Sequence, residues 1–184
     1  MNEYIKSMRK YIGHERNSLD SAKPFDIQPV DPYREFVDRQ IAESWAGPYV
    51  ISKGFLHDTR TQGGFTALED GAVIGYILYN IVDSDCEITV LESIHEGRGV
   101  GRALINAVQQ IAEKKNCRRL WLVTTNDNTH AIRFYQRLGF SLHAVHINSL
   151  KNAREIKPRI PPTGNDNIPI LHEFEFELLL PVDE

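Results

Sequence analysis

Glycines at alternating positions are the residues of this sequence that point most directly to chemistry. They are Gly97, Gly99 and Gly101, and they join a predicted strand to a predicted helix. Because glycine has no Cβ atom, backbone N–H groups here can approach a ligand closely, and the amino end of a helix favours negative charge. Arg98 and Arg102 can add charge-assisted hydrogen bonds. The stretch therefore predicts a phosphate or pyrophosphate site in preference to an ordinary tight turn.

The spacing of these glycines excludes two common nucleotide-binding loops. Counted from Gly97, the third small position of a dinucleotide fingerprint, Gly-x-Gly-x-x-Gly or Ala, falls on Arg102. Counted from Gly99, it falls on Leu104. A phosphate-binding loop of the Walker type needs Gly-Lys-Ser/Thr, and the sequence has no such tripeptide. The glycines must belong to another kind of phosphate site.

The glycine stretch resembles the coenzyme A motif of the GNAT superfamily of acyltransferases, Gln/Arg-x-x-Gly-x-Gly/Ala. Gly99 and Gly101 match its two small positions. The first motif position falls on Glu96, where the family has Gln or Arg. A carboxylate beside phosphates repels them unless it turns outward, so this departure concerns the affinity for the cofactor more than its identity.

A second segment, residues 124–140, resembles the Asn-x-x-Ala…Tyr…Gly-Phe segment of the same family. The matching positions are Asn128, Ala131, Tyr135 and Gly139. Both motifs occur in the family's order, and the resemblance extends over residues 25–148. It implies an N-acetyltransferase that uses acetyl-CoA as the acyl donor. It also implies the mixed α/β GNAT fold, with a central sheet of about six to seven strands and helices on both faces.

The resemblance also implies a role for individual residues. Backbone pairing with the pantetheine arm would fall on Leu91, Glu92 and Ser93, where one strand splays from the next. The pyrophosphate would be held by Gly97, Arg98, Gly99, Val100, Gly101 and Arg102. Asn128 and Ala131 would contact the pantetheine side, and Tyr135 would protonate the departing thiolate. A phenol can serve as that donor because it stays neutral at physiological pH.

The implied reaction is direct attack of a neutral amine on the thioester in a ternary complex. It requires a base for the amine proton and an N–H donor for the oxyanion. Glu87 and Glu92 are the candidate bases because they lie on or just after the strand nearest the thioester. A backbone amide of residues 91–93 is the candidate donor. Either carboxylate could instead be a solvated edge residue, and Tyr135 could be a core residue on an apolar helix stripe.

Acidic and aromatic side chains alternate on the last predicted strand, so Glu173, Glu175 and Glu177 share one face, which could bind a cationic acceptor. We expect the acceptor to be an amine-bearing small molecule, peptide or protein, and the chain could form a homodimer. The alternative function is a non-catalytic acyl-CoA-binding or sensor module that acts through a protein partner.

Hydrophobic periodicity and turn residues predict the elements that position these side chains. The predicted strands are 25–30, 65–69, 73–82, 86–94, 120–125, 140–147 and 170–180, with Asp70-Gly71 as a two-residue hairpin turn. The predicted helices begin at Asp31-Pro32, near Ala103 and after the capping residue Asn128. Residues 49–64 are predicted to be irregular, and 148–169 to be a long linker near the acceptor side.

The bulk composition predicts one globular domain, residues 24–184, after a peripheral arm or helix at residues 1–23. The chain has 184 residues, 41% hydrophobic and 25% charged, with a net charge of −4, which gives no general attraction for nucleic acid. Its apolar runs are shorter than the roughly 20 residues of a membrane span. We therefore expect a cytoplasmic protein. Cys86 and Cys117 form no Cys-x-x-Cys pair and the histidines lack ligand spacing, so no metal site is predicted.

Overall fold

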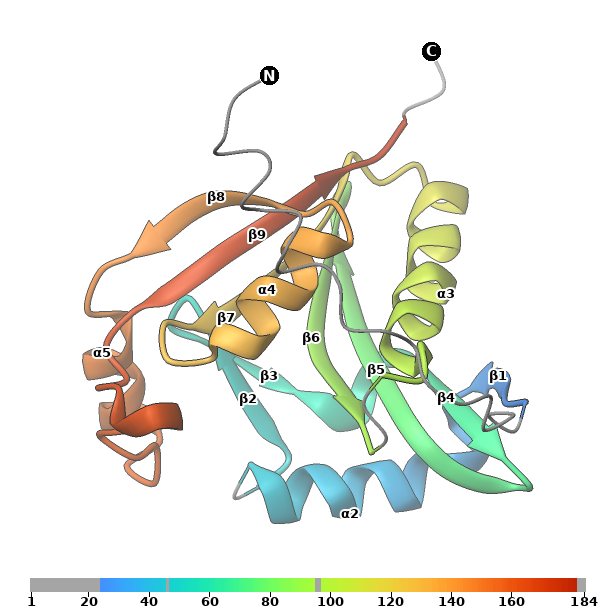
Figure 1. Ribbon diagram of the computed structural model, residues 1–184, viewed down its shortest axis with the longest axis horizontal. Coiled ribbons are helices and arrows are strands. Elements are labelled where there is room, and N and C mark those ends of the chain that lie inside the picture. The colour runs from blue at the N-terminus through green and yellow to red at the C-terminus, as the bar shows by residue number, and fades with distance from the viewer. Residues whose placement is uncertain (1–23, 46, 95–96, 182–184) are drawn as a thin grey trace, which may run out of the picture.

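The computed structural model describes residues 24–45, 47–94 and 97–181, so the predicted N-terminal arm and Glu96 lie outside the described residues. The strands are β1 (Asp26–Pro29), β2 (Tyr49–Ser52), β3 (Phe55–Asp58), β4 (Gly63–Glu69), β5 (Ala72–Val82), β6 (Asp85–Ser93), β7 (Arg119–Thr125), β8 (Ser141–His146) and β9 (Glu173–Leu179) (Figure 1). The helices are α2 (Arg34–Ser44), α3 (Val100–Lys114), α4 (Thr129–Arg137) and α5 (Ser149–Ile156), and the short 3-10 helices are η1 (Asp31–Tyr33), η2 (Thr59–Thr61) and η3 (Asn165–Asn167).

Seven of these strands form one mixed sheet in the order β1-β4-β5-β6-β7-β9-β8, and β2 and β3 form a separate hairpin. Neighbouring strands of the large sheet are antiparallel, except that β6 and β7 are parallel. A parallel pair requires a crossover connection, and α3 supplies it. The mixed α/β sheet predicted from the sequence is confirmed.

Packed elements cover both faces of the sheet, because successive side chains of a strand point to opposite faces. On β5, Ile77 packs into a core that includes residues of α3 and α4. Tyr76 and Leu78, its neighbours in sequence, pack into a second core with α2 and β2. In Figure 1, α2 runs below the strands and α3 stands beside them. The prediction of helices on both faces is therefore also confirmed.

The predicted hairpin and helix starts are found close to where the sequence placed them. Asp70 and Gly71 have φ values of 49° and 81°, and both left-handed conformations fit the two-residue turn between β4 and β5. The Asn128 side chain accepts a hydrogen bond from the Ala131 N–H at 3.1 Å and so caps α4. Gly139, with φ of 96°, follows the end of that helix.

Two regions differ from the prediction. Residues 49–64 were predicted to be irregular but contain the β2–β3 hairpin, whose turn residues Lys53 and Gly54 have φ values of 51° and 81°. The predicted linker at 148–169 contains α5 and η3. Leu150 and Ala153 of α5 are buried in a small third core with Ile170. None of the helices in the described residues is long and apolar enough to cross a membrane.

Candidate active site

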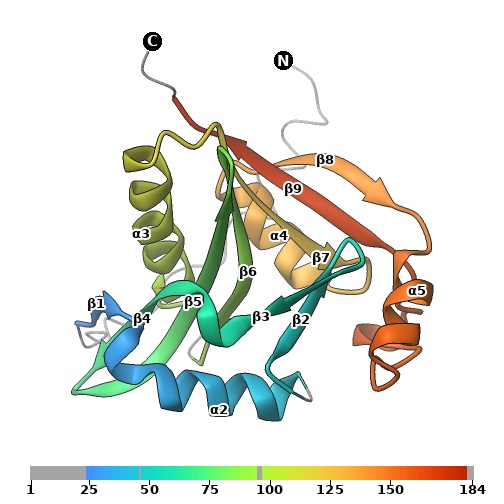
Figure 2. The ribbon, with the colours of Figure 1, turned by 180° about the vertical axis from the view of Figure 1, so that it is seen from behind.

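The parallel strands β6 and β7 stay together for only part of their length. They pair from Asp85 to Glu87 of β6, opposite Arg119 to Trp121 of β7, and no register continues beyond that point. Just after it, Thr89 is an extra residue in β6, because Ile88 pairs with Tyr79 and Val90 with Leu78. Such a bulge bends the strand that carries it. Figure 2 shows β6 and β7 diverging from their shared end.

The divergence exposes one edge of β6 to the space between the two strands. The Ile94 N–H donates to the Ile74 carbonyl at 2.9 Å, on the β5 side. Backbone groups of an antiparallel pair alternate in direction, so those of Leu91 and Ser93 point away from β5, toward the opening. The residues predicted to pair with an extended ligand therefore have backbone groups directed into the gap.

The amino end of α3 borders the same end of β6. Gly97 and Gly99 have φ values of 77° and 82°, which are left-handed conformations that favour glycine. Gly99 is the N-cap of α3 and makes no side-chain cap. The N–H groups of residues 100–102 therefore have no partner within the helix. A Cβ atom on Gly101 would lie 3.1 Å from the Phe134 ring, so this glycine also allows α3 and α4 to pack closely.

The remaining predicted phosphate-binding residues lie in different surroundings. The Arg98 guanidinium forms an ion pair with Glu69 on β4, with a second contact of 3.2 Å, which ties it to the sheet. Arg102 is exposed in the first turn of α3. The Val100 side chain is buried in the core, so only its backbone faces the helix end. The structure thus leaves Arg102 as the more accessible of the two arginines.

A cavity of about 560 Å³ fills the space between the diverging strands. Its walls come from β6, β7, the carboxyl end of α2, the β2 strand and the segment from α5 to β9. The predicted residues in its lining are Glu87, Leu91, Glu92 and Asn128. The cavity therefore gathers residues of β6 and of the second motif segment, whereas the glycine stretch 97–102 and Tyr135 are not part of its lining.

Glu87 lies on β6 in the wall of this cavity and is buried. Desolvation raises the pKa of its carboxyl group, although a hydrogen bond from the Ser52 hydroxyl and the nearby charges of His57 and Lys53 lower it. The His57 Nε2 atom lies 3.7 Å from Glu87 Oε2, whereas Glu87 Oε1 is inaccessible and makes no hydrogen bond of ordinary geometry with the described residues. A buried carboxyl group with a raised pKa is a suitable proton acceptor near neutral pH.

Glu92, the other candidate base, also lines the cavity but has a strong partner. The Tyr76 hydroxyl donates a short hydrogen bond to Glu92 Oε2. Tyr76 is 1% exposed and anchored in the second core, so this bond fixes the carboxylate against the sheet. Burial raises the pKa of Tyr76, and it remains a donor to Glu92 throughout the ordinary pH range.

Tyr135 packs deep in the first core, which was the alternative to its catalytic role. Its ring contacts Phe134, Phe140 and Phe176, with centroid separations of 5.3, 5.7 and 6.4 Å. Burial raises the pKa of its phenol. The hydroxyl has no hydrogen-bond partner among the described residues, so the packing of the ring and a role for the hydroxyl are compatible.

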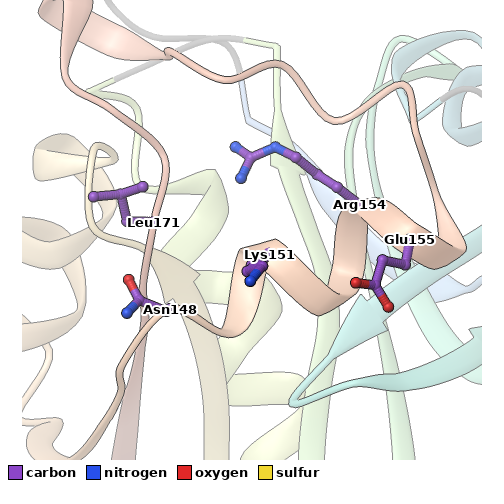
Figure 3. A pocket seen from close by; sticks show the side chains of 5 residues that line it. All are labelled: Asn148, Lys151, Arg154, Glu155 and Leu171. Atoms are coloured by element: carbon purple, nitrogen blue, oxygen red, sulfur yellow. The ribbon is translucent and has the colours of Figure 1, made fainter.

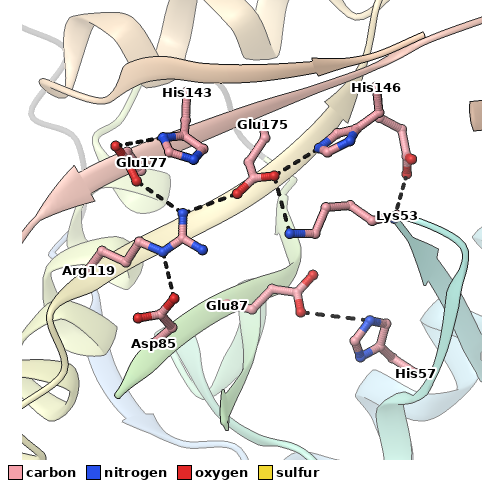
Figure 4. Close-up of polar contacts among 10 residues, drawn as sticks. Lys53, His57, Asp85, Glu87, Arg119, His143, His146, Glu175 and Glu177 are labelled. Carbon is pink, nitrogen blue, oxygen red and sulfur yellow. Dashed lines mark hydrogen bonds and ion pairs between the residues drawn. The ribbon is translucent and has the colours of Figure 1, made fainter. Parts of the chain in front are cut away.

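Two of the acidic side chains on β9 form ion pairs with cationic side chains of neighbouring elements (Figure 4). Glu175 Oε2 lies 3.2 Å from Lys53 Nζ and 2.8 Å from His146 Nε2. Arg119 Nη1 lies 3.1 Å from Glu175 and 3.0 Å from Glu177. These ion pairs hold the pKa of Glu175 below its ordinary value despite its burial. Glu175 and Glu177 are thus neutralised within the protein, and they do not present the uniform acidic surface that the strand pattern predicted.

Glu173 differs from the other two acidic residues of β9 because it lines the cavity. Its Oε1 atom accepts a 3.4 Å hydrogen bond from the Lys53 backbone N–H, and its Oε2 atom is buried and makes no hydrogen bond of ordinary geometry with the described residues. Desolvation raises the pKa of this carboxyl group. Sequence reasoning missed Lys53 and His57, whose only signal was the Lys53-Gly54 turn that brings the hairpin against the sheet.

The segment from α5 to β9 is held over the cavity by hydrogen bonds to backbone atoms. The Arg154 guanidinium donates to the carbonyl groups of Leu150, Ile160, Pro161 and Ile170. Asp127 Oδ2 accepts from the backbone and side-chain nitrogens of Asn165, both at 3.0 Å. A shallow surface cavity of about 610 Å³ on the outer side of α5 includes Lys151 and Arg154 (Figure 3). The segment is therefore a fixed wall of the central cavity.

The side chains that commonly bind metal ions do not form a metal-binding group within the described residues. Cys86 is buried and free, and burial raises the pKa of its thiol to about 12, which keeps it protonated. A protonated thiol is a poor nucleophile and a poor metal ligand.

Comparisons with known proteins agree with this geometry. A model described as the acetyltransferase (GNAT) family matches residues 23–140. Protein YdhI of Bacillus subtilis is 39% identical over 140 residues, which cover 76% of this chain and 88% of YdhI. The structure of an IAA acetyltransferase from Bacillus cereus has a TM-score of 0.66 at 16% identity, covering 85% of this chain and 100% of that one. The structure of a GNAT family acetyltransferase from Elizabethkingia anophelis with acetyl-CoA bound has a TM-score of 0.61 at 18% identity, covering 85% of this chain and 98% of that one.

Proposed function

Because this chain belongs to the GNAT family of acetyltransferases, we propose that it transfers an acetyl group from acetyl-CoA to a primary amine in the cavity between β6 and β7. The observation that carries the proposal is the early end of the β6–β7 pairing, after Glu87 and Trp121. It opens a strand edge of β6, which leads toward the amino end of α3, and a cavity between the two strands. An extended chain that ends in a pyrophosphate matches both features.

The chain's own residues supply the contacts for such a donor. The backbone groups of Leu91 face the gap and can pair with the amides of a pantetheine arm, as an added strand would. The amides of residues 100–102 and the side chain of Arg102 can bind the pyrophosphate, with Gly97 and Gly99 allowing the turn before them. Bound acetyl-CoA would supply the activated thioester carbonyl.

Glu87 is the residue that we propose as the general base. The amine must lose a proton as its nitrogen attacks the thioester carbonyl carbon, and Glu87 is a buried carboxyl group of the cavity wall whose raised pKa suits it to accept that proton. Glu92 is the weaker candidate, since Tyr76 already occupies one of its oxygens. A backbone N–H at Leu91 is the proposed donor to the oxygen that gains negative charge.

Tyr135 is the proposed acid for the last step. When the carbon–sulfur bond breaks, the thiolate needs a proton, and a phenol whose pKa is raised by burial holds its proton until a strong base is present. The hydroxyl without a described partner can turn to such an acceptor. Release of the free thiol and the acetylated amine then returns Tyr135 and Glu87 to their starting forms through solvent.

Two measurements on the full-length protein test this proposal. Isothermal titration with acetyl-CoA should show binding at one site, and addition of a primary amine should release a free thiol detected by a disulfide reagent. Absence of acetyl-CoA binding to folded protein would remove the proposed function altogether. Binding without thiol release across a wide range of amines would instead support the acyl-CoA-binding module.

A further inference from the structure

The charged residues that line the central cavity are divided between its two ends. The strand β2 forms one wall of the cavity and defines its two ends, because Tyr49 lies at one end of the strand and Ser52 at the other. The carboxyl groups of Glu87 and Glu173 lie near the Ser52 end and the cations near the Tyr49 end, whereas the third carboxyl group of the lining, Glu92, is already bonded by the Tyr76 hydroxyl. The contacts of each group with β2 establish these positions.

The acidic end is formed by Glu87 and Glu173. Both are at least nine-tenths buried, at 6% and 3% exposure, and both line the cavity. Glu87 Oε1 and Glu173 Oε2 make no hydrogen bond of ordinary geometry with the described residues, although the Ser52 and Ser149 hydroxyls interact with these carboxyl groups and lower their pKa values. The Glu173 contact with the Lys53 N–H places it at the turn that follows Ser52. Keeping two buried carboxyl groups charged is costly, and a bound ammonium group at this end of the cavity would offset that cost.

The basic end is formed by the segment after α5. The Lys157 Nζ atom donates to the Tyr49 carbonyl at 2.7 Å, which fixes this segment at the opposite end of β2. Arg159, two residues further on, lines the cavity and is exposed. It makes no hydrogen bond or ion pair with the rest of the described chain. Arg159 is therefore a cation on an anchored segment, with its donors available to a ligand.

The wall between the two ends is apolar. Val50 and Ile51 of β2 line the cavity, as do Ile88 from β6 and Ile160 from the segment after α5. From Tyr49 to Ser52 the strand extends about 10 Å, at about 3.3 Å per residue. A short alkyl chain could lie along this wall with one charged group at each end.

We infer that the acceptor is a zwitterion, a small primary amine whose far end carries a carboxylate or another anion. Its ammonium group would be held by Glu87 and Glu173, and its anion by Arg159. This inference rests on the proposed function, since Glu87 is also the proposed base. A diamine would place its second cation against Arg159 and Lys157, where like charges repel.

Three amines with the same six-carbon chain test the inference: 6-aminohexanoate, hexylamine and 1,6-diaminohexane. They differ only in the far group, which is an anion, a methyl group or a cation. Initial rates of thiol release with acetyl-CoA should give kcat/KM at least tenfold higher for the amino acid than for the diamine, with hexylamine between them. A preference for the diamine, or equal rates for all three, would contradict the inference.

Charge variants then test whether Arg159 is the cause. Arg159→Gln should bring the amino acid close to hexylamine, and Arg159→Glu should reverse the order and favour the diamine. Lys151→Gln is the matched control, because Lys151 is an exposed cation on the outer side of α5 and outside the central cavity (Figure 3). It should keep the wild-type ratio. An unchanged ratio in Arg159→Glu would exclude Arg159 as the recognition residue.

Failure of the inference can be separated from failure of the proposed function. If acetyl-CoA binds in calorimetry but none of the three amines is acetylated, the zwitterion is excluded and the donor site stands. If acetyl-CoA does not bind, the proposed function fails first. Binding of 6-aminohexanoate can also be measured directly by titration into the protein saturated with CoA, and Glu173→Gln should weaken it.

Discussion

The two buried carboxyl groups of the cavity have different expected consequences when they are changed. For Glu87 the consequence is catalytic. Desolvation raises its pKa, so the base is protonated at low pH and becomes active as the pH rises through that value. The pH profile of kcat/KM should therefore rise with pH over a range above the ordinary carboxyl value, and this rise should be absent from Glu87→Gln.

Loss of a general base usually reduces turnover by roughly 10²- to 10⁴-fold, which is the expected loss for Glu87→Gln. Glu92→Gln is the informative comparison, because both residues line the cavity and both lose one charge. A greater loss in Glu92→Gln than in Glu87→Gln would assign the base to Glu92. Steady-state rates with one amine at saturating acetyl-CoA provide the measurement.

For Glu173 the expected consequence is a change in the pH dependence of folding stability. Its raised pKa means that the folded protein binds this proton more tightly than the unfolded chain does. The stabilisation is fully present below the ordinary carboxyl value and is lost as the pH rises through the folded-state value. The melting temperature of Glu173→Gln, relative to wild type, should therefore increase as the pH rises above the ordinary carboxyl value. Glu155→Gln, on an exposed residue of α5, is the control; a difference that shrinks with pH would refute the argument.

Tyr135 allows packing and catalysis to be separated by removal of one oxygen atom. Tyr135→Phe keeps the ring contacts with Phe140 and Phe176, so the melting temperature should change little. Loss of the proposed acid should reduce kcat by roughly 10²-fold. Unchanged kcat in a folded variant would leave Tyr135 as a core residue only.

At the scale of elements, the prediction concerns α3. Its first-turn amides and Arg102 are proposed to bind the pyrophosphate, so Arg102→Glu should weaken acetyl-CoA binding tenfold or more in calorimetry. Lys114→Glu makes the same charge change at the other, exposed end of the helix. Equal losses of affinity in the two variants would indicate a general charge effect and not a site at the amino end.

The elements also show what could be predicted from the sequence. Asp70-Gly71 and the Asn128 cap are local signals, and both elements formed as expected. The β2–β3 hairpin was missed because Lys53-Gly54 is a weaker turn signal than Asn-Gly or Asp-Gly. The helix α5 was missed because it is short and its stability comes from contacts of Leu150 and Ala153 with distant residues.

The same reasoning applies to the site. Motif residues such as Leu91 and Asn128 were found because they follow a local pattern. The partners of Glu87 and Glu175 could not be predicted from the sequence. His57 reaches Glu87, and Lys53 reaches Glu175, only through tertiary packing of the hairpin. Distinguishing Glu173, which lines the cavity, from Glu175 and Glu177 required coordinates because all three share one strand face.

At the scale of the whole molecule, the sheet consists of two parts joined by a short parallel junction. Strands β1, β4, β5 and β6 form one part, and β7, β9 and β8 form the other. A ligand in the gap contacts both parts, so acetyl-CoA should raise the melting temperature and slow amide exchange at Leu91 and in the first turn of α3. Exchange at Lys115, just after the carboxyl end of α3 and at the opposite end of that helix from its first turn, is the internal control. Uniform protection across the chain would argue against a site in the gap.

The diverging edge of β6 has a consequence for handling the protein. Between turnovers, the hydrogen-bonding groups of Leu91 have no neighbouring strand, and exposed strand edges promote association between chains. Coenzyme A in the storage buffer should therefore act as a protective additive and slow the growth of light scattering in concentrated samples. The substrate would then serve as an eighth, removable strand.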